Sequence, residues 1–427
     1  MALITDLHIH SKYSRACSKS LDLPHIHAWA QIKGIDLVAT SDFTHPAWFK
    51  HLHEYLEEAD TGVYKLKEKY VNEADEDIIV PKSCAREVRF ICSTEISLIY
   101  KRHDQVRKVH LVVLAPNLET VAKINLELGK RGNVRSDGRP ILGMDSVDLL
   151  KILLDISPDI QIIPAHVWTP HFAIFGSKSG FDSVEECFGD LSDHICALET
   201  GLSSDPLMNW QLSDLDKYVL VSNSDAHSPH KMGREATIFD TECTYPGILH
   251  ALRNDHSQVL GTIEFFPEEG KYHADGLRDE KLCWTPEETI KHNCISPATG
   301  KKITVGVLHR VNKLADRKLG TQPKTGRPFW HIIPLVEILS EILEVGPSSK
   351  KVQTAYFYLI EKLGSEFYIL KDAPIQDITA VDERVGEAIK RMRDKEVIIN
   401  PGYDGEFGVI KLFKEEELKQ KDQLVMF

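Results

Sequence analysis

The sequence predicts an α/β protein built from β/α units around a parallel sheet or barrel. Up to about residue 266, short runs rich in valine and isoleucine alternate with amphipathic stretches, and each run is followed by a polar or proline-bearing loop. Strands that are apolar on both faces are typical of a parallel sheet covered by helices. In addition, histidine, aspartate and glutamate residues follow the ends of these runs.

The expected strands are short and regularly spaced. After a first strand that ends near Asp6, they are Ile35–Thr40, Phe90–Thr94, Val109–Leu114, Ile160–Pro164, His194–Glu199 and Tyr218–Ser222. The segments from about 55 to 85 and from 118 to 155 have helical or loop-like patterns. Because all strand carboxyl ends of a barrel open on one face, we expect the polar residues that follow the strands to gather there.

Two histidines near the amino terminus begin a predicted metal site. His8 and His10 are two residues apart, so on a strand they point to the same side. A single His-x-His pair is more often an ordinary strand end, but Asp225 and His227 repeat the spacing after a second apolar run. Further polar residues at strand ends are Asp42, His45, Glu95, His110, His166 and Glu199. Their joint occurrence predicts one cluster of metal ligands.

The ligand types indicate metal-dependent phosphoester hydrolysis. Imidazole and carboxylate without thiolate suit zinc, manganese or iron, with magnesium at positions richer in carboxylate. Clustered divalent ions bind a phosphate, generate hydroxide near neutral pH and stabilise the attacking and leaving oxygens. We therefore predict two or three divalent ions, zinc first, with magnesium or manganese as alternatives. Glu95, which could bridge two ions, is a predicted catalytic residue together with Asp225 and His227.

Composition sets broad limits on the protein. With 427 residues and 48.3 kDa, the chain is long enough for two or three domains. Its net charge of −13 argues against a surface that coats nucleic acid or an anionic membrane as a whole. No apolar run reaches transmembrane length, the amino terminus lacks a signal-peptide pattern, and the eight cysteines are scattered. We therefore expect a cytoplasmic protein with reduced thiols and no membrane partner.

The order and spacing of the polar motifs resemble the PHP (polymerase and histidinol phosphatase) family. The matching motifs are Asp6–Ser11, Asp42 with His45, Glu95, His110, His166 and Ser224–His227. The resemblance implies a distorted (β/α)7 barrel with three metal ions. It assigns His8, His10, Glu95 and Asp225 to one ion, Glu95, His110 and His166 to a second, and His45 or Asp42 with His227 to a third. Many members have His or Asp where this chain has Ala16, so we expect the third ion to be weaker or held by the Asp42–His45 loop.

Further motifs along nearly the whole chain narrow the resemblance to one family within the PHP group. They are His10–Arg15, Asp42–Pro46, Leu198–Pro206, Ser228–Glu235, Gly306–Val311 and Arg327–Phe329. These motifs look like the endonuclease Q family of DNA repair nucleases, which nick DNA on the 5′ side of a deaminated base or an abasic site. The resemblance implies a DNA partner containing uracil, hypoxanthine, xanthine or abasic lesions.

The chain divides into three predicted domains: the barrel at 1–270, a ribbon-like basic insert at 271–331 and a mainly helical module at 332–427. In the family, the insert resembles a zinc site with four thiolate-type ligands. Here the CxxC step is missing, because Pro297 stands three residues after Cys294. A structural zinc needs four ligands, so we favour a zinc-free insert in which Cys283 and Cys294 are only candidate ligands.

Basic residues are concentrated in part of the insert. Residues 301–331 hold eight Lys or Arg and one acid, interleaved with Phe329 and Trp330, which suits contacts to phosphates with some base stacking. The candidate DNA-binding residues are Lys12, Arg15, Arg234, Lys302, Arg310, Lys313 and Arg327. Trp168, His171 and Phe172 follow His166 and are candidates for a lesion pocket, with packing at the barrel rim as the alternative.

The pattern of the remaining residues predicts helices over Ile332–Val345, Ser348–Leu363 and Val381–Lys395, then a hairpin over Val397–Phe413.

Three functions remain open: a damage-directed DNA endonuclease, a histidinol-phosphatase-like monoesterase acting on a small molecule, and a non-catalytic binding module. The complete set of metal positions disfavours the third function. The basic stretch and about 160 residues beyond the barrel favour the first over the second.

Overall fold

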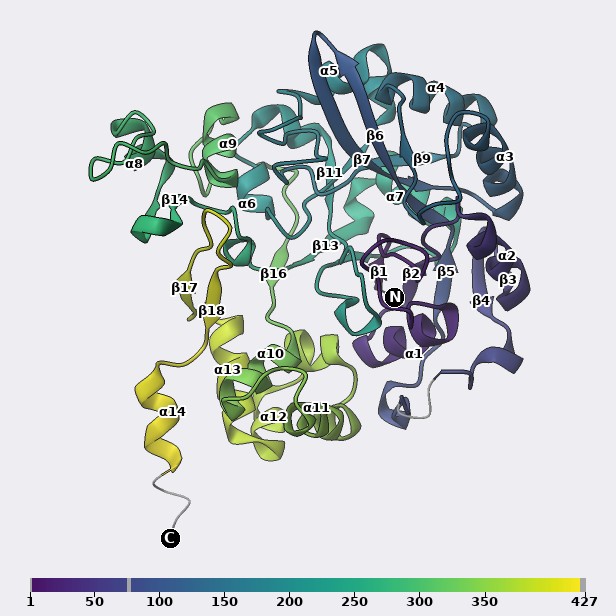
Figure 1. Ribbon diagram of the computed structural model, residues 1–427. Helices are drawn as coiled ribbons and strands as arrows, with labels where there is room; N and C mark the ends of the chain where they lie inside the picture. Colours follow the sequence, from purple (N-terminus) through teal and green to yellow (C-terminus); the bar gives the residue numbers. More distant parts are fainter. Residues whose placement is uncertain (1, 75–77, 423–427) are drawn as a thin grey trace.

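The computed structural model describes residues 2–74 and 78–422 (Figure 1). Their largest sheet has eight strands, in the spatial order β16 (Phe329–His331), β13 (Val259–Glu264), β12 (Ala236–Phe239), β1 (Leu3–Asp6), β2 (Leu37–Ala39), β5 (Arg89–Ile91), β4 (Val63–Leu66) and β3 (Leu56–Asp60). Strands β1, β2 and β5 are parallel, whereas β12 is antiparallel to both β1 and β13. The three parallel strands are those that the apolar runs predict.

A second sheet continues the arrangement. It consists of β8 (Ile141–Leu142), β6 (Ser93–Arg102), β7 (Gln105–Leu114) and β9 (Gln161–Pro164), and beside it β10 (Ala197–Glu199) pairs in parallel with β11 (Val219–Val221). Single backbone contacts link the sheets: Val167 N donates to Glu199 O at 3.0 Å, and Ile9 forms a parallel bridge with Ala226. The strand ends therefore converge on one region.

The α/β class is confirmed, but the described strands do not close into one (β/α)7 barrel. Two features of the chain account for this difference. β6 and β7 form a ten-residue antiparallel hairpin where a β/α unit would need a helical crossover. In the eight-stranded sheet, β12 pairs with β1 in the antiparallel direction, and β13 pairs with β12 in the same way, so the sheet next to β1 is not parallel.

The helices of the first part begin where the sequence supplies caps. They are α1 (Leu23–Lys33), α2 (Pro46–Tyr55), α3 (Leu118–Gly129), α4 (Ser146–Ile156), α5 (Val184–Phe188), α6 (Pro206–Asn209) and α7 (Tyr245–Arg253). Asp22, Asn117 and Asp145 accept hydrogen bonds from backbone N–H groups in the first turns of α1, α3 and α4. The apolar sides of these helices pack onto strands whose side chains are buried, such as Val38 and Val112.

Each expected apolar run contains a strand, whereas the segment from 55 to 85 is not the helix or loop that its pattern indicates. It begins with the β3–β4 hairpin, which turns at Gly62 with φ +71°. β3 carries Glu57, Glu58 and Asp60, so this edge strand is charged and lacks the apolar run that marks a buried strand. No helix among the described residues is long and apolar enough to span a membrane.

The insert and the helical module follow the sheets. The insert contains β14 (Asp275–Leu277), β15 (Leu282–Trp284), α8 (Pro286–Lys291) and α9 (Val307–Leu314), and lies at the upper left of Figure 1. The helical module contains α10 (Leu335–Leu343), α11 (Lys350–Leu363), α12 (Ile375–Val381) and α13 (Glu383–Arg393). After β17 (Ile398–Asn400) and β18 (Val409–Lys411), the last helix is α14 (Glu415–Asp422). Tyr403 bridges to Ala274, so the chain returns to the insert.

Cys283 and Cys294 do not form a metal site with other ligands in the described part of the chain. Cys283 is exposed on β15, and Cys294 lies in a left-handed turn with φ +57°. His292, the nearest alternative ligand in the sequence, stacks on Trp284 with a ring distance of 4.7 Å. Among the described residues, the groups of three or more ligating side chains lie at the strand ends of the sheets, and neither cysteine belongs to one of them.

A buried ion pair joins the helical module to α1. Lys33 Nζ lies 2.6 Å from Glu366 Oε2, and both side chains are 4% exposed. Glu366 also accepts hydrogen bonds from the Tyr356 hydroxyl and the Leu335 backbone N–H. A buried carboxylate is stable only when it is paired, so this contact ties the position of α11 to that of α1.

We expect Lys33→Met to lower the free energy of unfolding by about 3 kcal/mol, because Glu366 would remain as a buried charge without its cation. Urea denaturation monitored by circular dichroism measures this change. Lys217→Met is the control, since the Lys217–Glu185 pair is about half exposed and should contribute less than about 1 kcal/mol. An equal loss in both variants would contradict the coupling role of Lys33.

Candidate metal centre

Four side chains from three distant parts of the chain meet at the converging strand ends. His10 Nε2 lies 3.0 Å from Asp225 Oδ1 and 3.3 Å from Glu95 Oε2. His8 Nε2 lies 3.6 Å from each of the same two oxygens. His8 Nε2, His10 Nε2 and Asp225 Oδ1 are buried without a hydrogen-bond partner among the described residues. Three unpaired buried polar atoms aimed at one point fit a divalent cation.

A second group shares the carboxylate of Glu95. Its other oxygen, Oε1, lies 2.6 Å from His110 Nδ1 and 3.2 Å from His166 Nε2. Glu95 thus presents one oxygen to each group, which is the arrangement of a carboxylate that bridges two metal ions. The chemistry of this donor set, imidazole and carboxylate, suits zinc or manganese.

Further polar side chains hold the histidines in place. His8 Nδ1 contacts Glu199 Oε1 at 3.0 Å, and His10 Nδ1 contacts Asp42 Oδ1 at 3.2 Å. His166 Nδ1 lies 3.0 Å from Thr169 Oγ1. Each of these histidines uses one ring nitrogen in a hydrogen bond, so loss of the other proton turns the nitrogen that faces the centre into the lone pair that a metal requires.

The backbone around the centre is held by contacts between the two motif stretches. Asp6 accepts hydrogen bonds from Ser224 N and Ser224 Oγ, and Asp225 N donates to His8 O. Asp225 itself has φ +46°, in the left-handed region that costs energy for a residue with a side chain. These bonds hold the Asp225 loop next to the segment after β1 that carries the two histidines.

The electrostatics agree with a site built for cations. Burial opposes the charge of Glu95, but His110, Arg139 and His8 hold its pKa well below the usual value. Burial also opposes protonation of His8, yet Glu199 and Glu95 raise its pKa well above the usual value. Burial lowers the pKa of His110 to about 4, so this imidazole stays neutral and able to bind a metal.

The proposed third set of ligands is not brought together. Asp42 Oδ2 accepts hydrogen bonds from Ser11 N, Ser11 Oγ and Ser14 Oγ, so Asp42 supports His10 and presents no free oxygen. His45 Nε2 contacts the Arg135 carbonyl, and its ring stacks on Tyr13. His227 lies at the centre near His10, with ring centroids 4.6 Å apart, but the groups of metal ligands in the described residues do not include it.

The three residues predicted for lesion binding separate in the structure. Trp168 is 1% exposed, donates to Asn209 Oδ1 and packs on Phe175, so it belongs to the core, as the packing alternative held. Phe172 packs against the His110 ring, with centroids 4.6 Å apart. His171 is exposed and lines a cavity of about 700 Å³.

Among the predicted DNA-binding residues, Arg310 has a structural role instead. It is 9% exposed, and its guanidinium donates to the carbonyls of Phe175 and Phe181 and to Asp182. The reason is that α9 buries Val307, Arg310 and Val311 on one face, a direction that a charge count along the sequence does not reveal.

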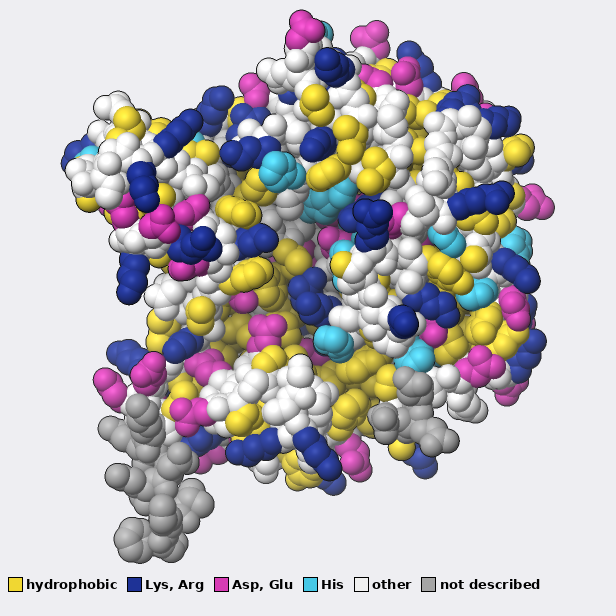
Figure 2. All heavy atoms as spheres, in the orientation of Figure 1, with side chains coloured by type: hydrophobic (Ala, Val, Ile, Leu, Met, Phe, Trp, Pro, Cys, Tyr) yellow, Lys and Arg dark blue, Asp and Glu magenta, His cyan; other side chains and the backbone are white. Residues whose placement is uncertain are grey.

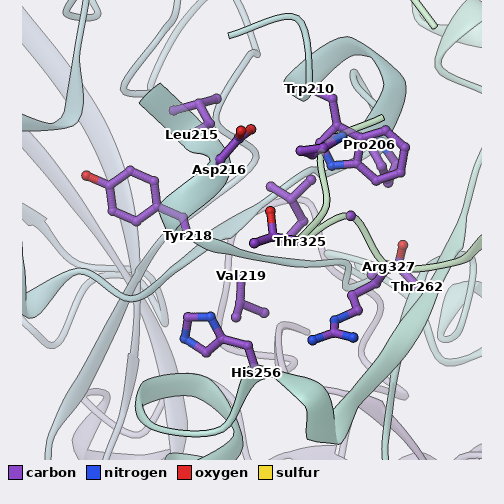
Figure 3. A pocket seen from close by; sticks show the side chains of 13 residues that line it. Pro206, Trp210, Leu215, Asp216, Tyr218, Val219, His256, Thr262, Thr325 and Arg327 are labelled. Atoms are coloured by element: carbon purple, nitrogen blue, oxygen red, sulfur yellow. The ribbon is translucent and has the colours of Figure 1, made fainter. Parts of the chain in front are cut away.

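The other predicted DNA-binding residues occupy different surfaces. Arg327 points into a small cavity with Trp210 and His256, near the start of β11, whereas the metal ligands follow the end of that strand (Figure 3). Arg234 donates to Ser224 O and lines the cavity of about 700 Å³. The other predicted basic residues, with side chains that are partly or fully exposed, are Lys12, Arg15, Lys302 and Lys313.

Two residues support the centre in a way that the sequence did not reveal: Glu199, which was predicted only as a member of the strand-end cluster, and Arg139, which was not predicted at all. Glu199 follows a predicted strand, but the pattern did not show that it would bind His8 and the backbone N–H of His166. Arg139 Nη1 donates to Glu95 Oε2 at 2.9 Å from a loop without any local motif. Only the position of Glu199 at a strand end could have suggested its involvement.

The fold and the site define the class of metal-dependent hydrolases. Among solved structures, the lesion-specific endonuclease PfuEndoQ from Pyrococcus furiosus is 30% identical, with a TM-score of 0.83 over 98% of this chain and 99% of that chain. Endonuclease Q in a complex with a 27-mer duplex bearing an abasic lesion is 31% identical, with a TM-score of 0.82 over 98% of both chains. The chain belongs to the endonuclease Q family.

Sequence comparisons cover smaller parts. The uncharacterized protein MJ0043 of Methanocaldococcus jannaschii is 32% identical over 260 residues, which are 59% of this chain, and the match spans about a third (32%) of that longer protein. The family model described as the MJ0043 C-terminal domain matches residues 334–396. This match covers helices α10 to α13 of the helical module.

We expect zinc binding to the metal-free protein to release protons at pH 7. The pKa values of His8 and His10 lie well above the usual value, so both rings carry a proton that must leave before a metal binds. Zinc affinity should therefore rise with pH. Calorimetric titration in buffers of different ionisation enthalpy counts the protons, and zinc binding without net proton release would contradict this assignment.

Proposed function

We propose that this protein is a metal-dependent DNA endonuclease that hydrolyses the phosphodiester 5′ to a deaminated base or an abasic site. The observation that carries the proposal is the Glu95 carboxylate, which presents one oxygen to each of two groups of metal ligands. Membership of the endonuclease Q family supports DNA as the substrate, and the abasic-site complex of a family member supports damaged DNA.

The ligands are assigned to two ions, zinc first. His8, His10, Asp225 and Glu95 would hold one ion, and Glu95, His110 and His166 would hold the other. Bound ions of this kind supply a hydroxide near neutral pH and stabilise the charge of the reacting phosphate. The histidines and carboxylates would set the positions of the ions, and the hydrogen bonds that Glu199 and Asp42 accept from His8 and His10 orient the imidazole rings.

His227 and Asp225 are the residues of this centre that face the substrate side. The side chains of His227 and Asp225 are 32% and 27% exposed, whereas those of His8, His10, Glu95, His110 and His166 are at most 10% exposed. His227 Nδ1 lies 2.8 Å from the Asp225 carbonyl, which can only accept, so Nδ1 carries the proton. Burial lowers the pKa of His227, which leaves its Nε2 as a proton acceptor near the reacting phosphate.

A cavity beside the centre supports the recognition of an extruded nucleotide. Its volume is about 700 Å³, and its lining includes Thr169, which contacts His166, together with His171, Arg234 and Tyr272. Figure 2 shows that this face is hollowed between the insert, the helical module and the sheets. A pocket of this size next to the reacting centre suits a flipped base, whose extrusion costs least at a damaged position.

We expect Glu95→Gln and Asp225→Asn to reduce cleavage of a uracil- or abasic-site duplex by at least about 100-fold while the fold stays intact. Each change removes a charge that holds the ions and removes no apolar contact. Gel assays measure cleavage and circular dichroism measures folding. Asp104→Asn, at the exposed tip of the β6–β7 hairpin, is the matched control. Near-normal turnover of either variant in saturating metal would refute the metal assignment.

For DNA binding, we expect the double variant Lys302→Ala, Lys313→Ala to reduce the slope of log affinity against log salt concentration by roughly two. Each lysine that contacts a DNA phosphate displaces about one counterion, and the variant loses both contacts. Affinity for damaged and undamaged DNA should fall alike, since phosphate contacts do not read sequence. Fluorescence anisotropy at several salt concentrations measures the slope. Lys151→Ala, on the exposed side of α4, is the control, and an unchanged slope in the double variant would leave these lysines as solvated residues.

A further inference from the structure

Arg139 contacts the carboxylate that joins the two groups of metal ligands. Its Nη1 lies 2.9 Å from Glu95 Oε2, the oxygen that also lies 3.3 Å from His10 Nε2 and 3.6 Å from His8 Nε2. The Arg139 side chain is 27% exposed, whereas Glu95 is fully buried. The guanidinium therefore stands between the buried centre and the surface from which a substrate approaches.

The loop that carries Arg139 is held on both sides. Gly138 N donates to Tyr13 O at 3.0 Å, and Thr44 Oγ1 donates to Gly138 O at 3.2 Å. A Cβ atom on Gly138 would collide with the Asp42 carboxylate, so only glycine allows this close approach. After Arg139, Ser97 N donates to Pro140 O at 3.0 Å, which ties the loop to the strand that carries Glu95.

Positive charge at this point has a specific use. The third set of ligands is not assembled, because the Asp42 carboxylate is occupied by Ser11 and Ser14 and His45 faces the Arg135 carbonyl. Arg139 lies in the loop next to Asp42 and supplies a fixed cation there. A guanidinium presents several donors in a planar fork that matches two oxygens of a phosphate, and it keeps its charge at any working pH.

We propose that Arg139 is a further catalytic residue, which binds a non-bridging oxygen of the scissile phosphodiester. Its guanidinium supplies the positive charge that a third metal ion would otherwise supply. The inference rests on the proposed phosphodiesterase function of the same centre. Arg139 remains protonated throughout, so it forms and breaks no covalent bond. It shares Glu95 with the ions and directs its remaining donors to the phosphate, whose charge increases in the transition state.

The test compares Arg139→Gln and Arg139→Lys with Arg135→Gln, an exposed arginine of the same loop. Three quantities are measured on folded protein: the turnover number on an abasic-site duplex, the turnover number on bis(p-nitrophenyl) phosphate, and the zinc affinity of the metal-free protein by calorimetry. We expect Arg139→Gln to lower both turnover numbers about 100-fold in saturating zinc. Arg139→Lys should retain an intermediate rate, because it keeps the charge without the fork, and Arg135→Gln should match the wild type.

Zinc affinity separates this role from a structural one. If Arg139 binds the phosphate, its loss leaves zinc affinity unchanged or tighter, since a cation next to Glu95 is removed. Weaker zinc binding, with a turnover number that returns to the wild-type value as the zinc concentration is raised, would overturn the inference. A turnover number within threefold of the wild type would overturn it as well. If the wild type hydrolyses bis(p-nitrophenyl) phosphate but not DNA, only the DNA function fails, and Arg139 is judged on the small diester. A wild type that hydrolyses neither overturns both proposals.

Discussion

The arrangement of the metal centre depends on one buried and charged carboxylate, that of Glu95. An ionised carboxylate removed from water is stable only beside cations or hydrogen-bond donors. His10, His110, His166 and Arg139 surround it within 3.3 Å, and they come from the segment after the first strand, a hairpin, a strand end and a loop. The same requirement that keeps Glu95 charged therefore brings together the groups that are able to hold divalent ions.

Support for this carboxylate extends outward through hydrogen bonds. Glu199 contacts both His8 and the backbone of His166, and thereby links the two groups of ligands from behind. Asp6 ties the loop of Asp225 to the first strand through Ser224. Because these supporting side chains are themselves buried, the metal ligands cannot reorient without leaving other polar groups unpaired. The centre is preorganised by the sheets, in agreement with hydrolysis by ions held at fixed positions.

The parts beyond the sheets form the surroundings of this centre. The insert and the β17–β18 hairpin contribute Tyr272 and Phe407 to the cavity that His171 also lines. The helical module is joined to α1 through Lys33 and Glu366, so its position is coupled to the same sheet. Basic residues of the 301–331 stretch serve several purposes: Arg310 fills a structural site, Arg327 lines a separate small cavity, and lysines remain exposed.

The sequence by itself determined the strands that lie within the apolar runs, because such runs mark buried strands. It also predicted which residues form the two groups of candidate metal ligands, since a spacing of two residues places His8 and His10 on one side. Tertiary structure decided which polar residues face the centre and which support it. Glu95, Asp42 and Glu199 all follow or continue apolar runs, yet only Glu95 presents its two oxygens to two different groups of ligands, whereas both oxygens of Glu199 contact the same nitrogen of His8. It also decided that Arg310 is buried and that Arg139 reaches Glu95 across 44 residues of chain. Local patterns report which side of an element is apolar, whereas contacts between distant loops depend on how the elements pack together.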